Sequence, residues 1–446
     1  MQSDTDTQGV WKLPLDILME VMTISRAEAA VLMRTCRLLY DLGPPYVLRD
    51  GVALHSKSQT ESFVSFMLAD TARLAYMRSL DLGPEIFDRR LNLEPHGTGA
   101  SFADLLGHPA TVLDTLILRN MEKLLVYNPH LLTPLVNMTS LRRLDVYGVG
   151  RVARDALRMM RSHLLFATVA LAGPLGYMPA LQCQTAFSDV FSALGFSSDT
   201  LQELDLFLGA PINPARDAPV SLQFPRVRTL RTVLDTHFPQ CSLLRLFPSL
   251  KVFHLLPGEG SFDVVNEPNA TWFMGFLRDA NGKIGLPPSF RLLECSAEVT
   301  SLCPFGAHLT VSKLRLLGYL NEHELPFLRV VLGETRPDEL EVSVPGLAVA
   351  EEVAGILREL GFGTLCVLKM NFLDPPVYTE QFCAVIDSLL EMNSNLKIIV
   401  NPPPWVCEGG VVLPADLAVP AEHALPDCDP VPESSSEEFD DRSTNM

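Results

Sequence analysis

An α/β solenoid is the fold class that this sequence predicts: a curved array with parallel strands on one face and helices on the other, preceded by a separate helical module. Three observations lead to it. A phrase of the form apolar-x-x-apolar-x-apolar recurs along the chain, segments with helical spacing of apolar residues lie between the copies, and residues 11–53 follow neither pattern. A strand–turn–helix unit cannot bury its own apolar face, so such units must stack on one another.

Residues 1–10 are expected to form a polar N-terminal tail, because they lack the basic-then-apolar layout of a secretory signal. The nine cysteines are scattered along the chain and never form a Cys-x-x-Cys pair. That pattern fits neither a disulfide framework nor a zinc module. We therefore expect a reducing compartment, the cytoplasm or the nucleus.

Residues 11–53 predict a helical module. The first helical run, residues 15–22, places its apolar residues on one face and follows Pro14, which stands where a helix tolerates proline. A second run covers residues 27–42, and Cys36 on it is expected to be a small buried thiol.

This segment resembles the F-box in three stretches. They are Leu13-Pro14-x-Asp16-Ile17-Leu18-x-Glu20-Val21, then Leu32-x-x-x-Cys36-Arg37-x-x-Tyr40, then Tyr46-Val47-Leu48. The resemblance implies a three-helix module that docks on a Skp-type adaptor and, through it, on the cullin and RING subunits of an SCF-type ubiquitin ligase. It also implies which residues meet the adaptor. Those that would enter its groove are Leu13, Pro14, Ile17, Leu18, Val21 and Met22, and those that would complete the module or its contact are Leu32, Cys36, Leu38 and Tyr40.

Physical arguments leave two interpretations of this module. About 40 residues are too few to bury a sufficient core, and exposed apolar area on such a unit indicates a partner. Alternatively, the helices only cap the first repeat, because the terminal units of a solenoid need a cover.

Residues 60–400 predict the solenoid itself, with about 12 irregular units whose strand phrases recur at a mean spacing of about 29 residues. The phrase and this spacing resemble the leucine-rich repeat. Together with the F-box-like segment and an acidic tail, they resemble the F-box and repeat proteins of filamentous and mushroom-forming fungi. The phrases start at Met77, Leu113, Leu141, Ala167, Leu201, Val227, Leu250, Phe290, Leu314, Leu340, Leu365 and Leu396.

Helices are expected between the strand phrases. Apolar residues at helical spacing occur, for example, at 63–74, 353–360 and 382–389. The opposite, concave face of such an array is suited to binding a protein. The predicted contact residues on that face are Arg142, Gln202, Arg228, Lys251 and Arg315.

Residues 401–446 predict a disordered acidic tail. They hold eight of the 34 prolines and ten acidic residues against a single arginine. Such a segment buries too little apolar surface to offset its chain entropy. Ser434 and Ser435 each precede a glutamate by three residues, a pattern that acidophilic kinases favour, although a solvated tail is the simpler interpretation.

The net charge is −18, from 53 acidic and 35 basic residues, and the tail carries half of it. Nucleic acids and anionic membranes require a basic surface. We therefore expect neither as a partner.

No motif predicts catalysis. The stretch Gly148-Val149-Gly150-Arg151-Val152-Ala153 has the G-x-G-x-x-A form of a dinucleotide-binding turn, but the acidic residue expected about 20 positions later is absent. Walker, His-Glu-x-x-His and Gly-x-Ser-x-Gly motifs are missing, and the ten histidines are dispersed. We therefore expect no enzyme activity, no cofactor and no metal.

The sequence thus predicts a non-catalytic receptor that brings a protein target to an SCF-type ubiquitin ligase. The alternative is a leucine-rich-repeat interaction scaffold without ligase attachment, in which the N-terminal helices act only as a cap.

Overall fold

The computed structural model describes residues 14–24, 26–84, 86, 98–171, 190–207, 222–233, 244–256, 290–302, 309–373, 380–401 and 411–413. Its 14 strands form one sheet in which spatial order follows chain order. The strands are β1 (Val52–Leu54), β2 (Ser79–Leu82), β3 (Thr115–Leu118), β4 (Arg143–Val149), β5 (Phe166–Leu171), β6 (Glu203–Phe207), β7 (Thr229–Val233), β8 (Val252–Leu256), β9 (Phe290–Ala297), β10 (Leu309–Tyr319), β11 (Glu339–Val344), β12 (Val367–Phe372), β13 (Lys397–Asn401) and β14 (Val411–Leu413).

Helices connect the strands, and Ser56 and Asn120 show why they start where they do. Each side-chain oxygen caps a helix by accepting a hydrogen bond from the backbone N–H three residues on. The α-helices are α1 (Leu15–Ile24), α2 (Arg26–Met33), α3 (Arg37–Leu42), α4 (Pro44–Leu48), α5 (Lys57–Leu68), α6 (Thr98–Gly107), α7 (Met121–Tyr127), α8 (Leu132–Asn137), α9 (Arg151–Met159), α13 (Val299–Leu302), α14 (Leu325–Thr335), α15 (Leu347–Glu359) and α16 (Glu380–Met392). The 3₁₀ helices are η1 (Thr71–Tyr76), η3 (Pro129–Leu131) and η4 (Gly195–Ser197).

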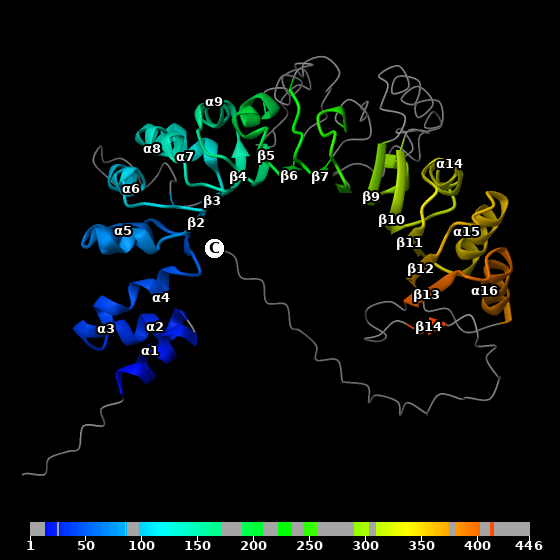
Figure 1. Ribbon diagram of the computed structural model, residues 1–446, viewed down its shortest axis with the longest axis horizontal. Coiled ribbons are helices and arrows are strands. Elements are labelled where there is room, and N and C mark those ends of the chain that lie inside the picture. The colour runs from blue at the N-terminus through cyan, green and yellow to red at the C-terminus, as the bar shows by residue number, and fades with distance from the viewer. Residues whose placement is uncertain are drawn as a thin grey trace, which may run out of the picture.

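The sheet curves into an arch with the strands on its inner side and helices such as α7, α9, α14 and α15 on its outer side (Figure 1). Strands β1 to β13 pair in parallel with their neighbours, whereas β14 runs antiparallel to β13. This arrangement confirms the predicted curved α/β solenoid. In the described part of the chain, no helix has the length and apolar character to cross a bilayer.

One buried residue from each parallel strand stands opposite its counterpart in the next strand, and we call this set the ladder row. Its members are Val52, Leu80, Leu116, Leu144, Ala167, Leu204, Leu230, Phe253, Cys295, Leu314, Leu340, Leu368 and Ile398. Cys295 takes the place of a leucine in this row, and complete burial raises the pKa of its thiol to about 12.

The ladder row corrects the predicted register of some phrases. In most copies it takes the second apolar residue, as at Leu80. In three copies it takes the first apolar residue of the predicted phrase, namely Ala167, Leu314 or Leu340. The ladder position therefore lies three residues earlier in these phrases than in the others. In β9 it takes Cys295, whereas Leu293, the second apolar residue of the phrase that starts at Phe290, is 54% exposed.

Both ends of the sheet also differ from the predicted boundaries. Strand β1 belongs to the sheet through its pairing with β2, although the sequence places it within the module of residues 11–53. Strand β1 has only three residues, and no apolar residue stands three positions before Val52 to start the phrase. The repeat pattern therefore does not reveal this strand. Strand β14 falls within residues 401–446, which were predicted to be disordered, because its Val-Val-Leu run pairs with β13.

The N-terminal module has a small core of its own. Met22, Ala29, Met33 and Leu39 are buried together there, apart from the core of the solenoid. The predicted single helix over residues 27–42 is wrong: α2 ends at Met33 and α3 begins at Arg37.

Cys36 lies in the break between α2 and α3 and is exposed, contrary to the expected burial. Its extended backbone places it at the N-cap of α3. The last turn of α2 closes through the Thr35 hydroxyl, which donates to the Leu32 carbonyl at 2.7 Å.

Arg73 connects the module to the solenoid. Its guanidinium lies 4.9 Å from the ring centroid of Tyr40 in α3 and 4.3 Å from that of Phe66 in α5. It also donates to the Phe66 carbonyl at 2.6 Å and to the Tyr40 hydroxyl at 3.3 Å. The module is therefore fixed beside the β1 end of the arch (Figure 1).

Candidate functional site

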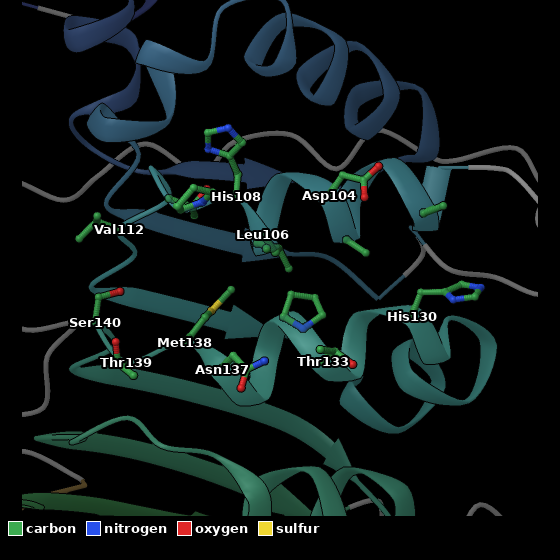
Figure 2. Close-up of a pocket in the computed structure, with 16 residues that line it drawn as sticks. Asp104, Leu106, His108, Val112, His130, Thr133, Asn137, Met138, Thr139 and Ser140 are labelled. Carbon is green, nitrogen blue, oxygen red and sulfur yellow. The ribbon is translucent and has the colours of Figure 1, made fainter.

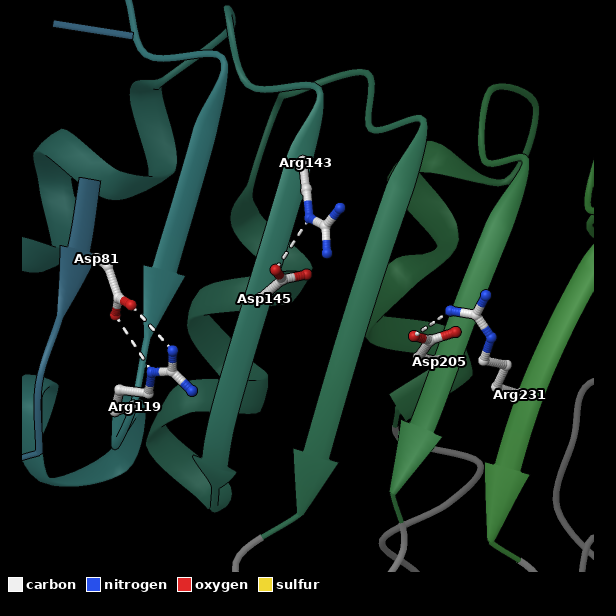
Figure 3. A network of polar contacts seen from close by, with 6 residues as sticks. All are labelled: Asp81, Arg119, Arg143, Asp145, Asp205 and Arg231. Carbon is white, nitrogen blue, oxygen red and sulfur yellow. Dashed lines mark hydrogen bonds and ion pairs between the residues drawn. The ribbon is translucent and has the colours of Figure 1, made fainter. Parts of the chain in front are cut away.

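The inner face of the sheet carries the side chains that flank the ladder row, because successive residues of a strand point to opposite faces. Asp and Arg side chains occupy many of these positions between β2 and β7. Three ion pairs form there, as Figure 3 shows: Asp81 with Arg119, Asp145 with Arg143, and Asp205 with Arg231.

The three pairs differ in geometry. Arg119 donates to both Asp81 oxygens, through Nη2 at 2.9 Å and Nε at 3.2 Å, and this hydrogen bonding raises the pKa of the Arg119 guanidinium. Arg143 donates to Asp145 Oδ2 through Nε alone, at 3.0 Å. Its two terminal nitrogens make no hydrogen bond to that carboxylate.

Asp145 is the most buried acid of this face, at 5% exposed, and its Oδ1 atom has no hydrogen-bond partner within the described residues. Farther along, burial raises the pKa of the Asp205 carboxyl, while the charge of Arg231 opposes that shift. Burial, followed by the charge of Arg231, lowers the pKa of His254. The positive charge of this part of the face therefore comes from arginines at neutral pH.

An apolar row crosses the same face beside the ion pairs. These residues are partly exposed, lie three positions after the ladder row and follow one another over β4 to β8: Tyr147, Ala170, Phe207, Val233 and Leu256. The Arg119 guanidinium covers the Tyr147 ring at 5.3 Å from its centroid. Charged and apolar side chains thus share one concave surface.

Four of the five predicted contact residues do not lie on this face. Arg142, Gln202, Arg228 and Lys251 directly precede their strands, at the entry edge of the sheet. Arg315 does lie on β10, where it pairs with a glutamate. The prediction failed because it chose the wrong x positions of the phrase. The x positions that face the concave side flank the second apolar residue, whereas these four predicted residues follow the first.

The residues implied by the F-box resemblance are spread between core and surface of the module. Leu13 lies outside the described residues. Met22 is 1% exposed and belongs to the core of the module, so its side chain is not part of the surface. Leu18, Val21 and Leu32 are half-buried, whereas the exposed members are Pro14, Ile17, Cys36, Leu38 and Tyr40.

Two of these exposed residues share a hollow. Cys36 and Tyr40 line an open depression of about 710 Å³ at the junction of α2 and α3, together with Met33, Arg34 and Arg37. Further apolar side chains of the module are exposed without having been predicted, among them Leu15, Ile24 and Val31.

A groove of about 650 Å³ lies between α6 and α8 on the helical side of the arch (Figure 2). His108 and His130 lie at opposite ends of it (Figure 2), and His108 Nδ1 accepts a hydrogen bond from the Ala110 N–H. The imidazoles therefore do not converge on one point. No group of three or more His, Cys, Asp or Glu residues suited to a metal ion occurs in the described residues.

The G-x-G-x-x-A stretch has a structural role. Glu122 in α7 places its carboxylate at the N-terminus of α9, where Val152 N–H and Ala153 N–H donate to it at 3.1 and 2.8 Å. A Cβ on Gly150 would lie 2.5 Å from the Glu122 carboxyl carbon, so glycine is needed for this approach. A carboxylate thus occupies the site where a dinucleotide phosphate would bind.

No protein-family model and no curated protein matches the sequence, so the F-box resemblance rests on the residues given above. Among solved structures, the chain is similar to the leucine-rich-repeat-containing protein LegL7 of Legionella pneumophila. The TM-score is 0.33 and the identity 12%, over 61% of this chain and 87% of the other.

Proposed function

We propose that this protein is a non-catalytic receptor that holds a protein target on its concave sheet face and docks through its N-terminal module on a Skp-type adaptor. Through that adaptor it would join the cullin and RING subunits of a ubiquitin ligase. Such a receptor needs no reactive group of its own, because holding the target near the transfer machinery raises the effective concentration.

The observation that carries the adaptor part is the exposed apolar surface of the module. Ile17 is 45% exposed and Leu38 53% exposed, although the module already has a core of its own. Helices serving only as a solenoid cap would turn such side chains towards the first repeat. Exposed apolar residues on a small unit instead favour a partner.

Adaptor binding is tested with the full-length protein. Wild type should retain a purified Skp-type adaptor in a pull-down, and Ile17→Asp with Leu38→Asp should abolish retention, because each carboxylate would have to be desolvated in the contact. The matched control is Val126→Asp, which changes a 51% exposed side chain of α7 in the solenoid.

The control variant should retain the adaptor like wild type. Retention by the double variant, or no retention by the folded wild type, would leave the scaffold without ligase attachment as the better function.

A further inference from the structure

The charges on the concave face are layered. In four ion pairs the acidic side chain is only 6–20% exposed, whereas the arginine side chain is 44–54% exposed. The pairs are Asp81–Arg119, Asp145–Arg143, Asp205–Arg231 and Glu341–Arg315. A partner that approaches this face therefore meets guanidinium groups first, despite the net charge of −18.

The guanidinium groups retain capacity for a ligand. Arg143 donates to Asp145 through Nε alone, and Arg231 donates to Asp205 through a single nitrogen, Nη1, at 3.3 Å. The planar fork of arginine matches a carboxylate in two parallel hydrogen bonds. Carboxylate groups of a partner fit the outer layer of this face.

The apolar row adds a second requirement. Tyr147 to Leu256 crosses five neighbouring strands, which spans about 19 Å at about 4.8 Å per strand. About six residues of an extended peptide cover that length. A segment lying across the strands would contact the apolar row with some side chains and the arginines with others.

We infer that the concave face between β3 and β8 binds an acidic polypeptide segment that also carries apolar side chains. This rests on the proposed function, since it names the class of target. The buried carboxylates cancel much of the long-range positive field, so the face binds by direct contact. Nucleic acid is disfavoured, because its affinity depends on a net positive surface that releases counterions.

The experiment uses the full-length protein and a displayed library of random peptides about 12 residues long, about twice the span of the row. We expect enrichment of peptides that combine Asp or Glu with apolar residues. Arg143→Gln should lose this enrichment. Arg329→Gln is the matched control, because Arg329 is equally exposed at 53% and equally ion-paired, but lies on α14 of the helical side.

The affinity of one enriched peptide is then measured, and two substitutions should change it in opposite directions. Arg143→Gln should weaken binding about tenfold, as expected for one lost charge-assisted contact. Asp81→Asn should strengthen it several-fold by freeing Arg119, provided that thermal unfolding shows an intact fold. Arg329→Gln should leave the affinity unchanged.

Several results would overturn the inference: enrichment of neutral or basic peptides, no enrichment, or equal affinities of wild type and Arg143→Gln. Single-stranded DNA that competes with the peptide would assign the face to nucleic acid. Enrichment only after the acids of residues 427–441 are changed to amides would make the chain's own tail the occupant. Failure here leaves adaptor retention intact, and loss of adaptor retention leaves the panning result unchanged, so the two proposals fail separately.

Discussion

At the scale of single residues, a motif can carry a structural contact in place of the chemistry it suggests. Gly148 to Ala153 has the spacing of a phosphate-binding turn, but in the structure its amides bind a carboxylate of the same chain. The carboxylate of Glu122 satisfies amides at the start of α9, and Gly150 leaves room for it. The sequence could not reveal this contact, because Glu122 lies in the preceding repeat.

Removal of the cap should cost stability. Glu122→Ala should lower the free energy of unfolding by about 1–2 kcal/mol, because the first amides of α9 lose their acceptor. The measurement is urea denaturation followed by circular dichroism. Glu359→Ala is the control, since its exposed pair with Arg329 should contribute less than about 1 kcal/mol. Equal effects of the two substitutions would refute a capping role for Glu122.

The concave arginines show a second limit at this scale. Alternation along a strand predicts which side chains leave the core, and it would have pointed to Arg143 and Arg231. Which carboxylate each one meets depends on strand register. Asp81 and Arg119 are 38 residues apart and come together only because β2 and β3 pair.

At the scale of elements, spacing predicted most strands correctly, and its failures have a physical cause. In β9, Leu292 and Leu293 are adjacent and equally apolar, so periodicity alone does not show which faces the core. The structure buries Leu292 and exposes Leu293. Cys295 escaped recognition as a leucine position because its side chain is smaller than leucine, and the equally small Ala167 was assigned to the first apolar place of its phrase. The break between α2 and α3 escaped prediction because no glycine or proline marks it.

The junction between module and solenoid rests on Arg73, which is buried between two aromatic rings. Arg73→Ala should loosen α1 to α4 from the arch, since a desolvated cation–π contact is worth about 2 kcal/mol. Amide hydrogen exchange should become at least about tenfold faster in α1 to α4 and stay unchanged in β10 to β13.

Arg78→Ala is the control for the junction, because Arg78 is half-exposed and its nitrogen lies 4.0 Å from the nearest Asp114 oxygen. It should leave exchange in the module as in wild type. Unchanged exchange in Arg73→Ala would show that the apolar contacts of the module suffice to hold it against the arch.

At the scale of the whole molecule, the arch is a one-dimensional stack: each strand of the described sheet pairs only with its neighbours in the chain. Stability in such an array is approximately the sum of unit and neighbour terms. The uninterrupted ladder row from Val52 to Ile398 provides these neighbour contacts. The distance between module and concave face is therefore set by how many units lie between them.

This architecture predicts a local response to a core substitution. Leu340→Ala, in the ladder row of β11, should cost about 2–5 kcal/mol, because it leaves a cavity between β10 and β12. Leu293→Ala makes the same chemical change at an exposed position and should cost less than about 0.5 kcal/mol. Hydrogen exchange should rise in β10 to β12 of Leu340→Ala while β2 to β4 keep wild-type protection. A uniform rise along all strands would contradict the one-dimensional stack, because it requires a single cooperative unit in which the N-terminal module and the whole sheet unfold together.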